Sequence, residues 1–317
     1  MHRRLLLLLA LTLLTSLPSR SAADTVSVLT IGNSFAENAL RFLPQLAEAA
    51  GHELIVGRAN LGGCSLERHW NHVAAFEKDP NSADGSPYEK GTRSLHDLLT
   101  SRNWDFITLQ QLSIKSHDLS TYTPFAENLC AYVRKYAPDS KLLVQQIWAY
   151  RVDDPRFVPK NAGKEPHTHL EMYQQVRAAY HTLAEELDLE IIPSGDAMFL
   201  ADTDPKWGFQ PDPAFNPKTA VYPALPDQSH SLHVGWTWRK LSDDAKPALR
   251  LDGHHANRTG EYLIGCVWFE KLFGQSVVDN AFVPEGIDAN DARFLRETAH
   301  QAVAKLSPTQ TEAGTTR

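Results

Sequence analysis

Apolar positions along the chain follow two patterns, short uninterrupted runs and longer segments with helical spacing. The short runs predict buried strands, because they are rich in apolar and β-branched residues. These predicted strands cover residues 26–31, 53–60, 104–110, 140–147 and 189–193. The predicted helices cover residues 39–50, 91–101, 123–136, 169–187, 259–273 and 291–306. Strands that alternate with helices favour an α/β fold, here a three-layer α/β/α sandwich with a central parallel sheet.

Two stretches interrupt this alternation and are predicted to be insertions in a domain that spans residues 24–306. Residues 71–90 are polar and irregular, and residues 201–250 are rich in proline and tryptophan. Loops of that length in a domain are usually functional or disordered. The tryptophans of the second insertion argue against plain disorder. The tail at 307–317 is predicted to be disordered.

The first 23 residues have the pattern of a secretory signal peptide. A short basic start precedes an apolar run from Leu5 to Leu14, and small residues at 21–23 fit a cleavage site. The apolar run is too short for a comfortable membrane span, and no later segment is apolar enough to cross a membrane. The sequence therefore predicts a periplasmic or secreted protein without a membrane span after removal of the signal.

Composition excludes some partners and leaves one question open. The formal net charge is −7, so the chain has no basic footprint for nucleic acid. The chain has three cysteines, Cys64, Cys130 and Cys266, so at least one thiol stays free, and one bridge of unknown pairing is allowed. Histidine pairs occur without cysteine or carboxylate partners at a recognisable spacing, so we predict no metal site. No glycine-rich phosphate loop is present, and no cofactor is predicted.

A sharp turn is expected where the first strand ends, at Gly32-Asn33-Ser34. Ser34 has two possible roles: it caps the following helix, or it is a nucleophile held on a strand-to-helix turn. In parallel sheets the functional site lies beyond the carboxyl ends of the strands. The glycines at 62–63 follow the second strand and the glutamines at 110–111 follow the third, so these groups are expected to converge with Ser34.

A second candidate lies in the stretch RLDGHHANRTG, where Asp252 and His255 are separated by two residues before a predicted helix. Nucleophilic acyl transfer needs a hydroxyl, a base that takes its proton, and a carboxylate that orients the base. An Asp-x-x-His turn can place the carboxylate near Nδ1 and leave Nε2 facing a serine. The alternative is a turn-forming aspartate and a capping or buried histidine.

The order of these motifs resembles the SGNH (GDSL-type) hydrolases, whose domain is a flavodoxin-like sandwich. The resemblance runs from about residue 26 to 273, and the blocks IGNSF, GGCSLE and LQQ are shared with a mostly uncharacterised subgroup. It implies that Ser34 is the nucleophile, His255 the general base and Asp252 the residue that orients it.

The same resemblance implies an oxyanion hole made of the Ser34 and Gly63 N–H groups and a side-chain amide. Gly63 is chosen over Gly62 because Gly63-Cys64-Ser65 fits the Gly-x-Ser pattern of the family. The alternative is that both glycines serve only a tight turn. The family expects Gly-x-Asn-Asp after the third strand, whereas this strand ends in ITLQQLS. Gln111 is therefore the expected substitute donor, with Gln110 and Ser113 as alternatives.

Three residues are predicted to bind substrate, namely Trp148, Gln110 and His254. Trp148 follows the fourth strand on the catalytic rim, where an aromatic ring can stack on sugar, unless it is a core residue. His254 precedes the expected general base and is either a substrate contact or a surface residue.

The sequence thus predicts an exported serine esterase without a cofactor. It would remove acyl groups, acetyl in particular, from a carbohydrate through an acyl-enzyme on Ser34. The alternatives are a lipase or small-ester hydrolase, and a non-catalytic glycan-binding protein on the same fold.

Overall fold

The computed structural model describes residues 23–157, 165–240, 242 and 244–306. The predicted signal peptide, apart from Ala23, and the predicted tail lie outside this range. The helices of the described part are α1 (Ser34–Leu40), α2 (Leu43–Ala49), α3 (Leu66–Lys78), α4 (Leu95–Thr100), α5 (Phe125–Tyr136), α6 (His169–Leu187), α7 (Ser194–Asp202), α8 (Arg258–Phe273) and α9 (Ala289–Leu306). None of these helices is long and apolar enough to cross a membrane.

Five parallel strands form the central sheet, in the order β2-β1-β3-β4-β5. They are β1 (Thr25–Gly32), β2 (Glu53–Asn60), β3 (Phe106–Leu109), β4 (Lys141–Gln145) and β5 (Glu190–Ile192). This order is that of flavodoxin-like sheets, in which the chain reverses its winding direction between the first and third strands. The α/β sandwich predicted from the hydrophobic pattern is confirmed.

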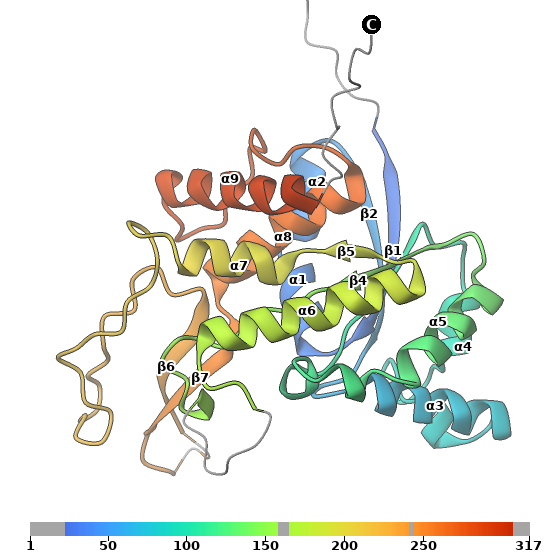
Figure 1. The fold of residues 1–317 in the computed structure, drawn as a ribbon, viewed down its shortest axis with the longest axis horizontal. Coiled ribbons are helices and arrows are strands. Elements are labelled where there is room, and N and C mark those ends of the chain that lie inside the picture. Colours follow the sequence, from blue (N-terminus) through green and yellow to red (C-terminus); the bar gives the residue numbers. More distant parts are fainter. Residues whose placement is uncertain (1–22, 158–164, 241, 243, 307–317) are drawn as a thin grey trace, which may run out of the picture.

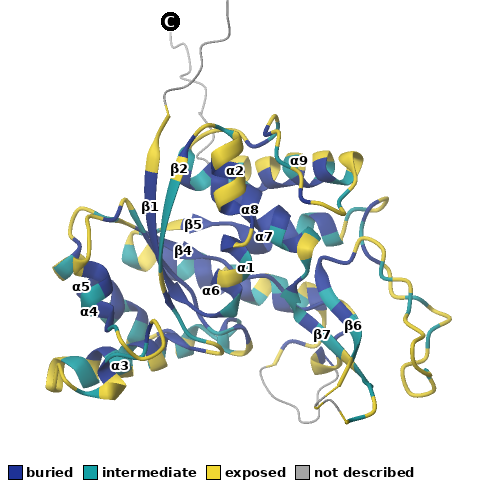
Figure 2. Cartoon of the chain, turned by 180° about the vertical axis from the view of Figure 1, so that it is seen from behind, coloured by how far each residue is buried: buried dark blue, intermediate teal, exposed yellow. Residues whose placement is uncertain are grey.

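Helices cover both faces of the sheet (Figure 1). Helices α3, α4 and α5 lie together on one side, and α1, α2 and α8 lie on the other, with α9 packed on the outside of α8. Strand β1 is buried from its second residue onward, and α8 is buried along most of its length (Figure 2). The first strand therefore ends inside the molecule, where the residues that follow it are held by neighbours on both faces.

Two segments in the N-terminal half differ from the prediction. The helix predicted at 39–50 is two helices, α1 and α2, and the second begins with Pro44 in its first turn. Part of the predicted first insertion is helical, because α3 runs to Lys78. Its buried positions include His69, a polar residue on an otherwise apolar face, which weakened the hydrophobic periodicity.

The second predicted insertion contains an ordered antiparallel hairpin. Its strands are β6 (His233–Arg239) and β7 (Ala248–Ala256). Trp207 anchors the preceding segment, since its ring stacks on Phe294 of α9 and its Nε1 donates to the Asp291 carboxylate at 2.7 Å. The insertion is thus attached to the helical layer by an aromatic anchor.

The three cysteines are buried and free, so none of them forms the disulfide that the sequence allowed. Burial raises the pKa of Cys64 to about 12 and that of Cys130 to about 11. These thiols therefore stay protonated and pack as small apolar side chains.

Two buried histidines join separate segments through backbone carbonyls. Nε2 of His69 lies 3.0 Å from the Gly32 carbonyl, and Nδ1 lies 2.8 Å from the Tyr88 hydroxyl. Because a carbonyl can only accept, Nε2 carries the proton and Nδ1 accepts from the tyrosine. His233 likewise donates from Nε2 to the Ala149 carbonyl at 3.0 Å. Burial lowers the pKa of His69 to about 4 and that of His233 to about 3.

Because of these two histidines, we expect the protein to lose stability in mild acid. The folded-state pKa values lie below the ordinary value of 6.5, so the unfolded chain takes up protons first as the pH falls. Between about pH 7.5 and about pH 5, His69 alone is expected to remove roughly 2 kcal/mol from the free energy of unfolding. Urea unfolding of wild type and His69→Gln at both pH values measures this, and the variant should show the smaller pH dependence. The exposed His167→Gln serves as control, and an equal pH dependence in all three proteins would contradict the assignment.

Candidate active site

Ser34 is the first residue of α1, directly after the turn that ends β1. Asn33, and not Ser34, is the N-cap, since its Oδ1 accepts the Phe35 N–H at 3.0 Å. The capping role considered for Ser34 is therefore wrong. Its hydroxyl is left to point at the imidazole of His255, with Oγ 2.9 Å from Nε2.

His255 and Asp252 lie on β7 and complete a hydrogen-bonded chain with Ser34. Nδ1 of His255 lies 3.0 Å from Oδ2 of Asp252 and 3.2 Å from Oδ1. The His255 backbone N–H also donates to Oδ1, at 3.1 Å. The carboxylate therefore holds Nδ1 and leaves Nε2 facing the serine, which is the geometry that proton transfer from a nucleophile requires.

The carboxyl of Asp252 stays ionised in this setting. Burial raises its pKa, but its contacts with the imidazoles of His254 and His255 outweigh that effect and hold the pKa well below the ordinary value. An ionised carboxylate at Nδ1 stabilises the imidazolium that forms when Nε2 takes a proton.

His254 lies beside this chain. Its Nδ1 is 3.0 Å from Oδ1 of Asp252, and its ring centroid is 4.0 Å from that of His255. About 30% of its side chain is exposed, as is about 31% of that of His255, so both rings are partly open to solvent. The donor atoms of Asp252, His254 and His255 lie within 4.8 Å of one another, a spacing that a metal ion also allows.

Trp148 does not line the site and is a core residue, so the predicted substrate contact is wrong. Its side chain is completely buried and stacks on Phe35 at a ring distance of 4.3 Å. Its Nε1 donates to the His254 carbonyl at 2.9 Å. Apolar packing from α1 holds the ring inside, where it supports the strand that carries the histidines.

A tight turn after β2 brings Gly63 to the same edge of the sheet. The Cys64 N–H donates to the Leu61 carbonyl at 3.1 Å, and Gly63, third in the turn, has φ of +59°, which favours glycine. The Leu61 N–H donates to the Gly32 carbonyl at 3.1 Å. Gly63 is exposed, and its N–H makes no hydrogen bond within the described part of the chain.

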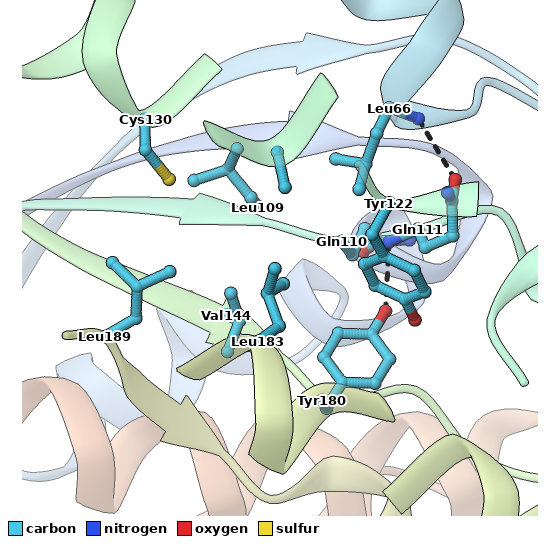
Figure 3. Close-up of a pocket in the computed structure, with 11 residues that line it drawn as sticks. Leu66, Leu109, Gln110, Gln111, Tyr122, Cys130, Val144, Tyr180, Leu183 and Leu189 are labelled. Atoms are coloured by element: carbon cyan, nitrogen blue, oxygen red, sulfur yellow. Dashed lines mark hydrogen bonds between the residues drawn. The ribbon is translucent and has the colours of Figure 1, made fainter. Parts of the chain in front are cut away.

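The side-chain amide of Gln111 is not available to a substrate, so its assignment as an oxyanion donor is wrong. Its Oε1 accepts the N–H groups of Leu66 at 3.1 Å and Leu112 at 2.9 Å, and its Nε2 donates to the Thr121 carbonyl at 2.9 Å. Figure 3 shows the Gln111 side chain turned toward the backbone of Leu66, beside a small apolar cavity. The residue is fully buried and joins the start of α3 to the loop after β3.

Gln110 and Ser113 are also committed to internal contacts. Nε2 of Gln110 donates to Oδ1 of Asn33 at 2.6 Å, and only 2% of Gln110 is exposed. Gln110 thus supports the cap of α1 and does not face a substrate, contrary to its predicted role. The buried Ser113 hydroxyl accepts a hydrogen bond from Tyr150 at 3.0 Å.

Comparison with protein families identifies the chain. The family described as "Domain of unknown function (DUF4886)" matches residues 27–205 and 239–302. The chain belongs to the DUF4886 family. The match covers most of β1 and all of α1 and β7, so the Ser34 turn and the Asp252–His255 strand are both within the DUF4886 domain.

Solved structures show the same fold. A crystal structure of a DUF4886 family protein from Bacteroides uniformis is 28% identical, has a TM-score of 0.67, and covers 89% of this chain and 95% of its own. A proposed SGNH hydrolase from Slackia heliotrinireducens is 18% identical, with a TM-score of 0.44 and coverage of 78% and 98%. A carbohydrate acetylesterase from Sinorhizobium meliloti is 15% identical, with a TM-score of 0.41 and coverage of 78% and 99%. The last two likenesses are too distant to assign an activity to this chain. No curated protein matches the chain.

Sequence reasoning missed two residues that build the DUF4886 site. Asn33 caps α1 and also donates from Nδ2 to the Cys64 carbonyl at 3.0 Å. Its place before a helix was a signal, since asparagine is a preferred N-cap. Arg239 lies on β6, and its Nη2 is 3.6 Å from Oδ2 of Asp252. No sequence pattern indicated this residue, because only the pairing of β6 with β7 places it beside Asp252.

The role of Gln111 can be tested with Gln111→Ala. We expect the free energy of unfolding to fall by about 2–4 kcal/mol, because the variant leaves buried backbone groups without partners. Urea unfolding measures the loss, with the exposed helical Gln174→Ala as control. A variant of unchanged stability with a selective, roughly hundredfold loss of kcat on an activated ester would instead mark Gln111 as an oxyanion donor.

Proposed function

We propose that the protein is an ester hydrolase that acts through an acyl-enzyme on Ser34. The observation that carries this proposal is the hydrogen-bonded chain from the Ser34 hydroxyl through His255 to the Asp252 carboxylate. The proposal rests on these distances in this structure, and not on the family match or on the distant structural neighbours.

The geometry supports a two-step reaction. Nε2 of His255 takes the proton as Oγ of Ser34 attacks the ester carbonyl, and then gives it to the leaving alcohol. In the second step Nε2 takes a proton from the water that attacks the acyl-enzyme, and then gives this proton to Oγ of Ser34, which leaves as the free hydroxyl while the acid is released. Asp252 keeps its negative charge throughout and orients the imidazole.

Two backbone donors are available for the negative charge that forms on the carbonyl oxygen. The N–H of Ser34 lies at the start of α1, where no intrahelical acceptor exists for it. The N–H of Gly63 is exposed in the turn that is bonded to Gly32. We therefore propose these two groups as the oxyanion donors, without a contribution from a glutamine side chain.

We further propose that the substrate is an acylated, in particular acetylated, carbohydrate met in the periplasm or outside the cell. The signal-peptide pattern of the sequence supports export. Trp236 and Trp238 of the hairpin segment are partly exposed, and aromatic rings of that kind can stack on sugars.

Hydrolysis of p-nitrophenyl acetate tests the nucleophile. We expect activity in the wild type and a loss of roughly a thousandfold or more in Ser34→Ala, because the variant removes the hydroxyl that lies at hydrogen-bond distance from Nε2 of His255. Asp252→Asn should show a comparable loss, since the amide no longer holds the imidazole in the required tautomer. Thr123→Ala, on the protein surface, is a matched hydroxyl deletion that should leave the rate unchanged. Equal rates in wild type and Ser34→Ala would contradict the proposal.

Acetate release from acetylated polysaccharides tests the substrate class. We expect release by the wild type and none by Ser34→Ala, because both the probe and the polysaccharide need the same nucleophile. A chain that cleaves p-nitrophenyl esters of long acyl groups faster than acetyl esters, and releases no acetate from polysaccharides, would instead be a lipase.

A further inference from the structure

The strand that carries Asp252 forms one polar face with its hairpin partner. Residues directly opposite each other in an antiparallel pair lie on the same side of the sheet, and side chains alternate along each strand. The pairs that contain or flank Asp252 are Gly235 with Asp252, Thr237 with Arg250, and Arg239 with Ala248. Arg239 and Arg250 therefore share the face that presents the catalytic carboxylate.

The opposite face of the hairpin is apolar and partly covered. Trp236, Trp238 and Leu251 alternate with the polar residues. Nε1 of Trp238 donates to the Ala224 carbonyl at 2.8 Å, and Phe215 packs near the Trp236 ring. The preceding insertion thus covers part of this face, and the two arginines lie on the other face, together with Asp252.

Few contacts within the described part of the protein compensate the charges of these arginines. The Arg239 side chain is 53% exposed, and its closest carboxylate contact in the described residues is Asp252, at 3.6 Å. Arg250 is exposed and makes no ion pair within the described part. By contrast, Arg156, on the segment after β4, is bound to the Asp154 carboxylate at 2.6 Å.

The positive charge of the two arginines contrasts with the formal net charge of the chain, which is −7. An anionic substrate approaching the site would be repelled by Asp252 and by the overall charge. Two guanidinium groups on the same face add positive charge beside Asp252, and each can bind a carboxylate or sulfate through two parallel hydrogen bonds. Arg250 and Asp252 are separated by one residue, which corresponds to about 7 Å along the strand.

We propose that Arg239 and Arg250 bind a negatively charged group of the substrate close to the ester that is cleaved. The natural ester is then carried by an acidic carbohydrate, with a carboxylate within about one sugar unit of the acyl group. This inference rests on the proposed function, since it assigns the substrate class of the same site.

Two acetyl esters, one anionic and one neutral, test the proposal. These are para-acetoxybenzoate, which is an anion, and its neutral methyl ester. We expect the wild type to prefer the anion in kcat/KM, and Arg239→Gln and Arg250→Gln each to reduce that preference by roughly fivefold. The preference should also weaken with added salt. The ratio is the readout, because an indirect effect of Arg239→Gln on Asp252 would change both rates alike.

Controls separate charge near the site from net charge. Arg293→Gln removes an exposed arginine on α9 and should leave the preference unchanged. A third probe, para-acetoxybenzenesulfonate, distinguishes the two kinds of anion. A preference for the carboxylate supports an acidic sugar with a carboxylate, whereas a larger preference for the sulfonate would overturn that part in favour of a sulfated one.

Failure of this inference differs from failure of the proposed function. Equal anion preference in the wild type and the Arg239→Gln/Arg250→Gln double variant would overturn the inference while leaving the esterase intact. If neither ester is hydrolysed, calorimetry on the wild-type protein decides. Binding of oligogalacturonate that is weakened in the double variant, with Arg293→Gln unaffected, supports the anion site. Absence of binding, or binding unchanged in the double variant, overturns it.

Discussion

The site depends on satisfying the buried polar groups where β1 ends. The Gly32 carbonyl accepts hydrogen bonds from the Leu61 N–H and from Nε2 of His69. The Asn33 side chain accepts from Phe35 and Gln110 and donates to the Cys64 carbonyl. Unpaired groups at this depth would each cost about 1–3 kcal/mol, so these bonds hold the turn in one conformation. The position of Ser34 follows from that conformation.

Gly32 also meets a steric constraint at this turn. A Cβ atom on Gly32 would lie 3.0 Å from Cδ of Gln110 and 3.0 Å from Cβ of Ala36. A larger residue would displace the glutamine that supports the cap. The absence of a side chain therefore lets the ends of β1 and β3 and the start of α1 meet at one point.

The three residues of the hydrogen-bonded chain come from two parts of the fold that must be held together. Ser34 begins α1 directly after the central strand β1, whereas Asp252 and His255 belong to the hairpin. The segment after β4 joins the two parts. The Arg151 N–H donates to the Gly253 carbonyl at 2.7 Å, and Trp148 packs between Phe35 and the histidine strand. These contacts are apolar or backbone-mediated and buried, so they hold the 2.9 Å distance between Ser34 and His255 without depending on exposed charges.

The sequence by itself determined the sheet and the identity of the three residues in the hydrogen-bonded chain. Strand burial is a local property of apolar runs, and the motifs around Ser34 and Asp252 occupy short stretches whose spacing can be read directly. The roles of Trp148, Gln110 and Gln111 were decided by tertiary structure alone. Each lies at the end of a strand, where position along the chain does not show which backbone groups need partners or which rings lie between layers. The two arginines were likewise placed beside Asp252 by the pairing of β6 with β7, a long-range contact that leaves no periodic pattern in an insertion rich in proline and tryptophan.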